Sequence, residues 1–161
     1  MTIDHELFMR KAIELAHNSP QCPFGALLVH QETGEIVAEG WNQSEEKLDP
    51  TSHGETEAIK NCIANRRLEK ADWRNLILYT TAEPCAMCAG AIYWTGIGML
   101  VFGSSIPFLR SLGDKWYAID IRAEELLKQG RPPWEGSVLG GILEKECNEL
   151  FERAPQISNK A

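Results

Sequence analysis

Two short segments of the chain carry side chains that can bind a metal ion. His53 and Glu55 stand in the segment His-Gly-Glu, and Cys85 and Cys88 stand in the segment Pro-Cys-Ala-Met-Cys. Cysteine sulfur and histidine nitrogen are donors that zinc accepts, and two cysteines three residues apart share one face of a helix. We therefore predict that His53, Cys85 and Cys88 bind one Zn²⁺ ion.

Three protein ligands leave the fourth tetrahedral position of zinc open for water, which is the arrangement of a catalytic site. Zinc makes bound water acidic enough to give hydroxide, a nucleophile, near neutral pH. Glu55 lies two residues after His53, too far round a helix to be a comfortable ligand but well placed to face that water. We expect Glu55 to move the protons, first as general base and then as general acid.

A Cys-x-x-Cys pair by itself is also typical of structural zinc sites and of redox sites. A closed zinc site usually needs a second close pair of ligands. The remaining cysteines and histidines are instead scattered along the chain, at Cys22, Cys62, Cys147, His5, His17 and His30. This spacing favours the open, catalytic site. A non-catalytic, zinc-stabilised binding module is the alternative from a different class of function.

Hydrophobic patterning predicts the framework that must position these ligands. It indicates helices at residues 6–17, 53–65, 84–94, 122–129 and 142–151, and strands at residues 24–29, 36–41, 76–80 and 99–102. Each candidate segment begins a predicted helix, where free amide groups and the helix dipole favour thiolates. Because strands alternate with helices, we predict an α/β fold with a mixed sheet whose faces are covered.

The length and the composition narrow the function classes further. A chain of 161 residues suits one compact domain, and we assign residues 1–154 to a single catalytic domain and residues 155–161 to a frayed tail. No apolar run approaches the ~20 residues that cross a bilayer. The acidic start of the chain is unlike a secretory signal, and five cysteines without a dense framework fit a reduced compartment, so we expect a cytoplasmic protein.

The net charge of −7 disfavours a polyanionic partner, because affinity for nucleic acid depends on Lys and Arg side chains that neutralise phosphates. We therefore expect a small-molecule substrate and no membrane or nucleic-acid partner.

The segments Asp49-Pro-Thr-Ser-His-Gly-Glu55 and Glu83-Pro-Cys-Ala-Met-Cys-Ala-Gly-Ala-Ile92 resemble the cytidine deaminase superfamily, particularly its branch of free-base and tRNA-adenosine deaminases. His-x-Glu followed by Pro-Cys-x-x-Cys is the signature of zinc-dependent deaminases, in which hydroxide attacks an amidine-like ring carbon and ammonia leaves. The resemblance implies a three-layer α/β/α sandwich around a five-stranded mixed sheet, a bound Zn²⁺ ion and a homodimer or larger oligomer.

The resemblance also implies substrate contacts. Asn42 matches an asparagine that hydrogen-bonds the substrate ring, Phe24 would line the pocket, and the segment at Glu83 would meet the reacting edge. Asp114 corresponds to an acidic residue near the amino group of a purine. Independently of the resemblance, three tryptophans could stack on a flat ring: Trp94, Trp116 and Trp134.

Three substrates follow from the resemblance. Ala-Glu-Pro-Cys85 followed by Gly-Ala-Ile-Tyr-Trp94 looks most like bacterial guanine deaminases, which makes guanine the first expectation. His53-Gly-Glu55 also resembles fungal-type cytosine deaminases. The tRNA-specific adenosine deaminases share the Cys-Ala-Gly-Ala feature, but they usually carry a basic surface for the anticodon arm, which this acidic chain does not suggest.

Overall fold

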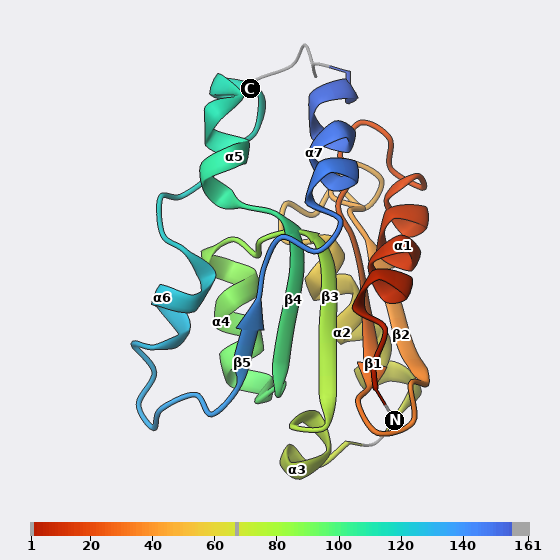
Figure 1. The fold of residues 1–161 in the computed structure, drawn as a ribbon, viewed down its shortest axis with the longest axis vertical. Helices are drawn as coiled ribbons and strands as arrows, with labels where there is room; N and C mark the ends of the chain where they lie inside the picture. The colour runs from red at the N-terminus through yellow and green to blue at the C-terminus, as the bar shows by residue number, and fades with distance from the viewer. Residues whose placement is uncertain (1, 67, 156–161) are drawn as a thin grey trace.

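A five-stranded mixed sheet forms the centre of the molecule (Figure 1). The structure is a computed structural model, and it describes residues 2–66 and 68–155. The strand order is β2-β1-β3-β4-β5, with β1 antiparallel to β2 and to β3, and with β3, β4 and β5 parallel. The strands are β1 (Gly25–His30), β2 (Ile36–Trp41), β3 (Leu76–Ala82), β4 (Met99–Ser104) and β5 (Ser137–Leu139). The predicted mixed sheet is confirmed.

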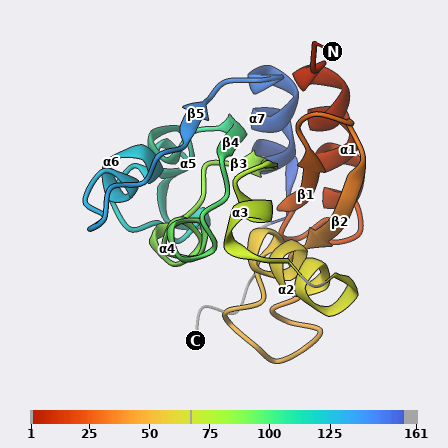
Figure 2. The same ribbon diagram turned by 90° about the horizontal axis from the view of Figure 1, so that it is seen from below.

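Helices cover both faces of this sheet, and the end-on view in Figure 2 separates the layers. One face packs against α1 (His5–Ala16) and α7 (Glu144–Arg153); the other packs against α2 (Gly54–Asn65), α4 (Ala86–Thr95) and α6 (Ala123–Leu127). In β1, Leu27 shares a core with Met9 of α1, whereas Leu28 shares a core with Ile59 of α2, because successive strand residues point to opposite faces. The predicted three-layer sandwich is confirmed.

Every helix and strand predicted from the patterning is present, with ends shifted by a few residues. Four short elements were not predicted: α3 (Lys70–Trp73), α5 (Ile106–Ser111), the 3₁₀ helix η1 (Gly113–Lys115) and β5. They span six residues or fewer, which is too short for a periodic signal. The three residues of β5 gain strand geometry by pairing with β4.

The fold brings the starts of α2 and α4 to one edge of the sheet. β3 ends at Ala82, and α4 follows after a short turn. α2 approaches β2 closely at Gly40, where an added Cβ would lie 2.4 Å from the backbone nitrogen of Ala58. Glycine is therefore needed at this contact between helix and sheet.

Two further expectations concern the C-terminal tail and membrane-spanning helices. The predicted frayed tail, apart from residue 155, lies outside the described residues. Among the helices of the described ranges, none is long and apolar enough to cross a membrane.

Candidate active site

The three predicted ligands lie together where α2 and α4 begin. His53 and Cys85 are the residues immediately before these helices, and Cys88 lies in the first turn of α4. The Sγ atoms of Cys85 and Cys88 are 3.6 and 3.7 Å from Nδ1 of His53. Two ligands bound to one tetrahedral zinc at 2.0–2.3 Å are roughly 3.6 Å apart. The donor set and its spacing therefore fit zinc, and within residues 2–66 and 68–155 no fourth metal-binding side chain joins the cluster.

The two cysteines are expected to differ in protonation. Interaction with Cys88, the largest cause, and with His53 lowers the pKa of Cys85 to about 4, which favours a thiolate at neutral pH. The neighbouring sulfur of Cys85, together with burial, raises the pKa of Cys88 well above its ordinary value. The contact with Cys85 also raises the pKa of His53. Cys85 is therefore ready to bind zinc as a thiolate, whereas Cys88 must lose a proton first.

Zinc binding is expected to release at least about one proton at pH 7. Zinc binds thiolates and neutral imidazole, so Cys88 must lose its proton, and the protonated fraction of His53 must lose one as well. Because the pKa of His53 is raised, its share of the release grows as the pH falls. Water bound to zinc ionises near neutral pH and adds to the release as the pH rises. Calorimetric titration with zinc in buffers of different ionisation enthalpy measures the number. A release well below one proton at pH 7 would contradict the thiol at Cys88.

Glu55 lies in the first turn of α2, 3% exposed, beside the ligand cluster. Burial raises the pKa of its carboxyl group, and the Cys85 thiolate raises it further. A carboxyl group with a raised pKa can hold a proton closer to neutral pH, as the predicted proton-moving role requires.

Thr80 was missed by the sequence reasoning. Its buried hydroxyl donates a hydrogen bond to Oε1 of Glu55 over 2.9 Å, which orients the carboxylate. Thr80 follows Leu78 by two residues, so it lies on the face of β3 that packs against α2 and α4. The signal in the sequence was that Thr80 is a polar residue at a position where the alternation of β3 predicts a core side chain.

A cavity of about 480 Å³ lies over Glu55 and the ligand cluster, within the size range of small-molecule sites. Phe24 and Trp116 form an aromatic wall, with their ring centroids 5.5 Å apart in an edge-to-face arrangement. Of the three predicted tryptophans, Trp116 lines the cavity. Trp94 is 81% exposed on α4, and Trp134 donates a hydrogen bond to the backbone of Ile97.

The predicted substrate residues are placed differently from one another. Asn42, Phe24 and Glu83 line the cavity. Oδ1 of Asn42 accepts hydrogen bonds from the backbone and the hydroxyl of Ser44, which leaves its Nδ2 group as the donor for a ligand. Asp114 was expected near a bound purine; it does not line the cavity but borders an adjoining surface hollow, which shares Trp116 with the cavity. A contact of Asp114 with the substrate stays a prediction.

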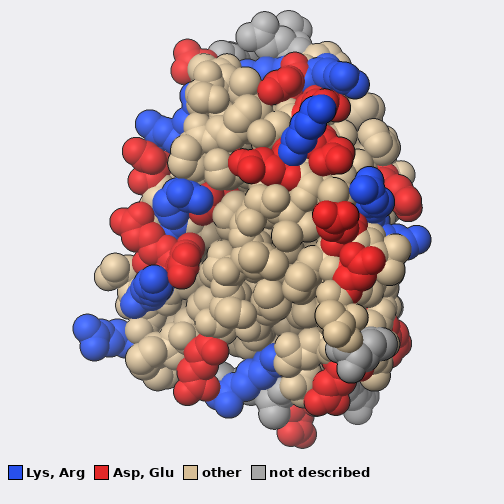
Figure 3. All heavy atoms as spheres, viewed as in Figure 1, with Lys and Arg blue, Asp and Glu red and all other residues tan. Residues whose placement is uncertain are grey.

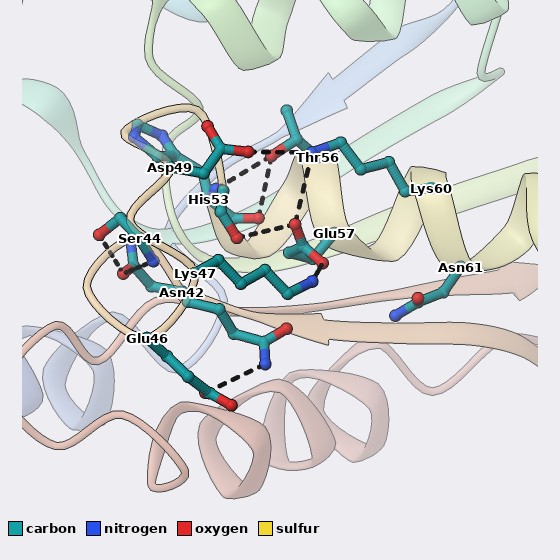
Figure 4. A network of polar contacts seen from close by, with 12 residues as sticks. Asn42, Ser44, Glu46, Lys47, Asp49, His53, Thr56, Glu57, Lys60 and Asn61 are labelled. Carbon is teal, nitrogen blue, oxygen red and sulfur yellow. Dashed lines mark hydrogen bonds and ion pairs between the residues drawn. The ribbon is translucent and has the colours of Figure 1, made fainter.

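A polar network holds the loop of residues 43–52 against α2 (Figure 4). Glu57 of α2 is 2% exposed, and it accepts hydrogen bonds from Nζ of Lys47 over 2.6 Å and from the hydroxyl of Ser52 over 2.7 Å. Ser44 and Leu48 of the same loop line the cavity. The buried carboxylate therefore fixes part of the cavity wall.

Glu57→Gln is expected to destabilise the fold by about 1 to 2 kcal/mol at pH 7, because two hydrogen bonds to a buried charge are weakened. The effect is limited because Lys47 is partly exposed, and solvent screens its attraction to Glu57. Burial alone would raise the pKa of Glu57, but its bonds to Lys47 and Ser52 lower it. A carboxyl group whose pKa is lower in the folded state stabilises the folded protein at pH values above its unfolded pKa of about 4.3, and this stabilisation is lost as the pH falls. Urea unfolding between pH 3 and 7 should show the two proteins converging in acid; a constant gap would contradict this assignment.

Comparison with known proteins agrees with the geometry. A model of the cytidine and deoxycytidylate deaminase zinc-binding region matches residues 2–104, which include all three ligands and Glu55. The chain is 36% identical over 148 residues to the tRNA-specific adenosine deaminase of Haemophilus influenzae, covering 89% of this chain and 79% of that protein. It is 42% identical over 96 residues to the guanine deaminase of Bacillus subtilis, covering 57% of this chain and 59% of that protein.

Among solved structures, the guanine deaminase from Nitrosomonas europaea superposes with a TM-score of 0.81 at 23% identity, covering 96% of this chain and 86% of that one. At this identity the likeness shows the fold. Relatives that act on different substrates thus resemble the chain to a similar degree, and the substrate has to be argued from the cavity.

Proposed function

Because the chain belongs to the family of the cytidine and deoxycytidylate deaminase zinc-binding region, whose members are zinc-dependent hydrolases, we propose that it deaminates a free nucleobase, with guanine as the first substrate. The observation that carries the proposal is a buried carboxylate, Glu55, beside three zinc ligands at the base of a small-molecule cavity. Residues 1–154 form the proposed catalytic domain.

The residues around the cavity have distinct tasks in this reaction. Zinc, when bound, supplies an activated water as nucleophile and removes the need for a strong base. Glu55 takes one proton from the attacking water and delivers it to a ring nitrogen, and it then takes the second proton of that water and delivers it to the leaving amine, while Thr80 keeps its carboxylate in place. Asn42 donates a hydrogen bond to the ring. The aromatic wall favours a flat ring.

The charges around the cavity favour a substrate without phosphate. Lys115 is the one basic side chain among the described residues that line it, and its Nζ already donates to the backbone oxygen of Glu152 over 2.9 Å. Figure 3 shows acidic and basic side chains interspersed over one face, without a broad basic area. Phosphate groups of a nucleotide or an anticodon arm would find few cationic partners.

Ammonia release tests the proposal. The purified, zinc-loaded protein is incubated with guanine, cytosine, adenine, their nucleosides and a tRNA anticodon stem-loop, with Glu55→Gln as the control. Glu55-dependent release from guanine supports both the chemistry and the substrate. Release from cytosine keeps the chemistry and replaces the substrate. If no compound of the panel releases ammonia, the free-base proposal is contradicted and the zinc-stabilised binding module is favoured.

A tRNA-specific adenosine deaminase is the second candidate, favoured by the 36% identity to the Haemophilus influenzae enzyme over 148 residues. Inosine formation in the stem-loop, with no release from free bases, would establish it. High salt separates the two candidates as well, because binding of a polyanion weakens steeply with salt and binding of an uncharged base does not.

We further propose that the enzyme is a cytoplasmic homodimer and that copies pair through α4. This ten-residue helix has no charged side chain, and Trp94 on its outer face is 81% exposed. A Cβ added at Gly90 would meet nothing within 4 Å in the single chain. Two copies with a net charge of −7 each would meet with least repulsion through such a face. Sedimentation velocity should show a dimer that Trp94→Glu converts to a monomer; a monomeric parent protein would refute this pairing.

A further inference from the structure

One wall of the cavity is built by the segment of residues 105–122, which connects β4 to α6. Ile106, Leu109 and Trp116 of this segment face the cavity. Much of the segment consists of short turns and short helices, so its own backbone hydrogen bonds do not determine its path. Contacts with the rest of the protein must hold the wall in position.

Glu83 contacts both ends of this wall. At one end, the backbone N–H of Ile106 donates to Oε1 of Glu83 over 2.9 Å. At the other end, the backbone N–H of Ala123 donates to Oε2 over 2.8 Å, and Nε of Arg122 donates to both oxygens over 2.9 and 3.0 Å. The side chain of Glu83 is 1% exposed. A single buried carboxylate therefore ties two points that are far apart in the wall segment.

The middle of the wall is attached elsewhere. Nζ of Lys115 donates to the backbone oxygen of Glu152 over 2.9 Å, and Nε1 of Trp116 donates to that of Phe151 over 3.3 Å. Both acceptors lie in the last turn of α7. The wall is thus fixed to Glu83 at its two ends and to α7 at its centre.

The hydrogen bonds leave Glu83 little capacity for a ligand. A carboxylate offers about four lone-pair sites, and the protein already supplies four N–H contacts to them. Glu83 also stands two residues before the zinc ligand Cys85. The turn that places this ligand therefore also places the wall relative to the metal site.

We propose that Glu83 is a positioning residue that fixes the wall of residues 105–122, and that it shapes substrate binding without contacting the substrate. This role replaces the substrate contact expected from the sequence. Its consequence for substrate affinity rests on the proposed function, because the cavity must be the place where the substrate binds. Its consequence for the wall itself does not.

Glu83→Gln tests the proposal. The substitution keeps the size of the side chain but turns one acceptor oxygen into an amide group that faces N–H donors. We expect amide hydrogen exchange in residues 105–123 to accelerate at least tenfold and KM to rise at least tenfold, while kcat changes less than threefold and one zinc ion stays bound. Glu125→Gln, at an exposed acid of α6, is the matched control and should change none of these quantities.

Arg122→Gln provides a graded second variant, because it removes the two guanidinium contacts and keeps both backbone contacts. Its exchange rates should fall between those of the parent protein and Glu83→Gln. It also decides the question if Glu83→Gln fails to fold, since unchanged exchange in residues 105–123 would then overturn the proposal.

A raised KM with unchanged exchange in Glu83→Gln would also overturn the proposal, because it would assign Glu83 a direct contact with the substrate. Unchanged exchange together with unchanged KM would overturn it as well. Hydrogen exchange needs no substrate. If no compound in the ammonia panel reacts, the proposed function fails, and the exchange result still decides the role of Glu83.

Discussion

Glu55→Gln is expected to lower kcat by about 10²- to 10⁴-fold while the protein keeps one bound zinc ion. The range is the contribution that a positioned general acid and base makes to an enzymatic rate. Glutamine preserves the shape of the side chain and can still accept the hydrogen bond from Thr80, but it cannot take up and return a proton. The loss should therefore fall on kcat, with KM changed little.

Ammonia release under substrate saturation and metal analysis of the same preparation measure the two quantities. Glu57→Gln is the matched control, because it makes the same substitution at another buried glutamate of α2, two residues away. It should retain kcat within a few-fold, because Glu57 does not line the cavity, and its effects should fall on stability and, through the loop that forms part of the cavity wall, on KM. If Glu55→Gln turns over at a near-normal rate, Glu55 does not move the protons and the mechanism proposed above is wrong.

Cys88→Ala is expected to abolish tight zinc binding and, with it, activity. Two of three protein ligands would remain, which is too few for a zinc site of this type. The substitution also removes the interaction with Cys88 that is the largest cause of the low pKa of Cys85. Cys85 should then be a thiol more often at neutral pH and a poorer ligand, so a single change weakens two ligands.

Zinc content after dialysis, and the thermal midpoint with and without added zinc, measure this effect. Zinc stabilises the folded state that binds it, so the parent protein should show a zinc-dependent midpoint and Cys88→Ala should not. Cys62→Ala changes another fully buried cysteine that lies away from the cluster, and it should keep both zinc and activity. Full zinc occupancy in Cys88→Ala would refute the assigned ligand set.

The longer elements were predictable because their periodic patterns are local. The hydrophobic positions of α1, and the apolar run of β3, specify a helix and a strand whatever surrounds them. The short α5 and η1 were not predictable, because their positions depend on Glu83 and on the end of α7, which are distant in the sequence. The same dependence decides that Lys115 lines the cavity whereas Asp114, in the same short helix, borders the adjoining hollow.

The sequence by itself determined the donor set and predicted the proton-moving role proposed for Glu55. The residue types of His53, Cys85 and Cys88, with the close spacing of the two cysteines and Glu55 beside the histidine, suffice for this, because ligand chemistry depends on the identity of the donor atoms. It also determined the alternation of helices and strands, since that pattern is local.

Only the tertiary structure decided what surrounds that chemistry. It brought Thr80 to Glu55, closed the cavity with Trp116 and bonded Glu83 to both ends of the wall segment. The physical reason is that hydrogen bonds and packing between distant segments depend on where the whole chain places them. Local sequence patterns do not specify those distances.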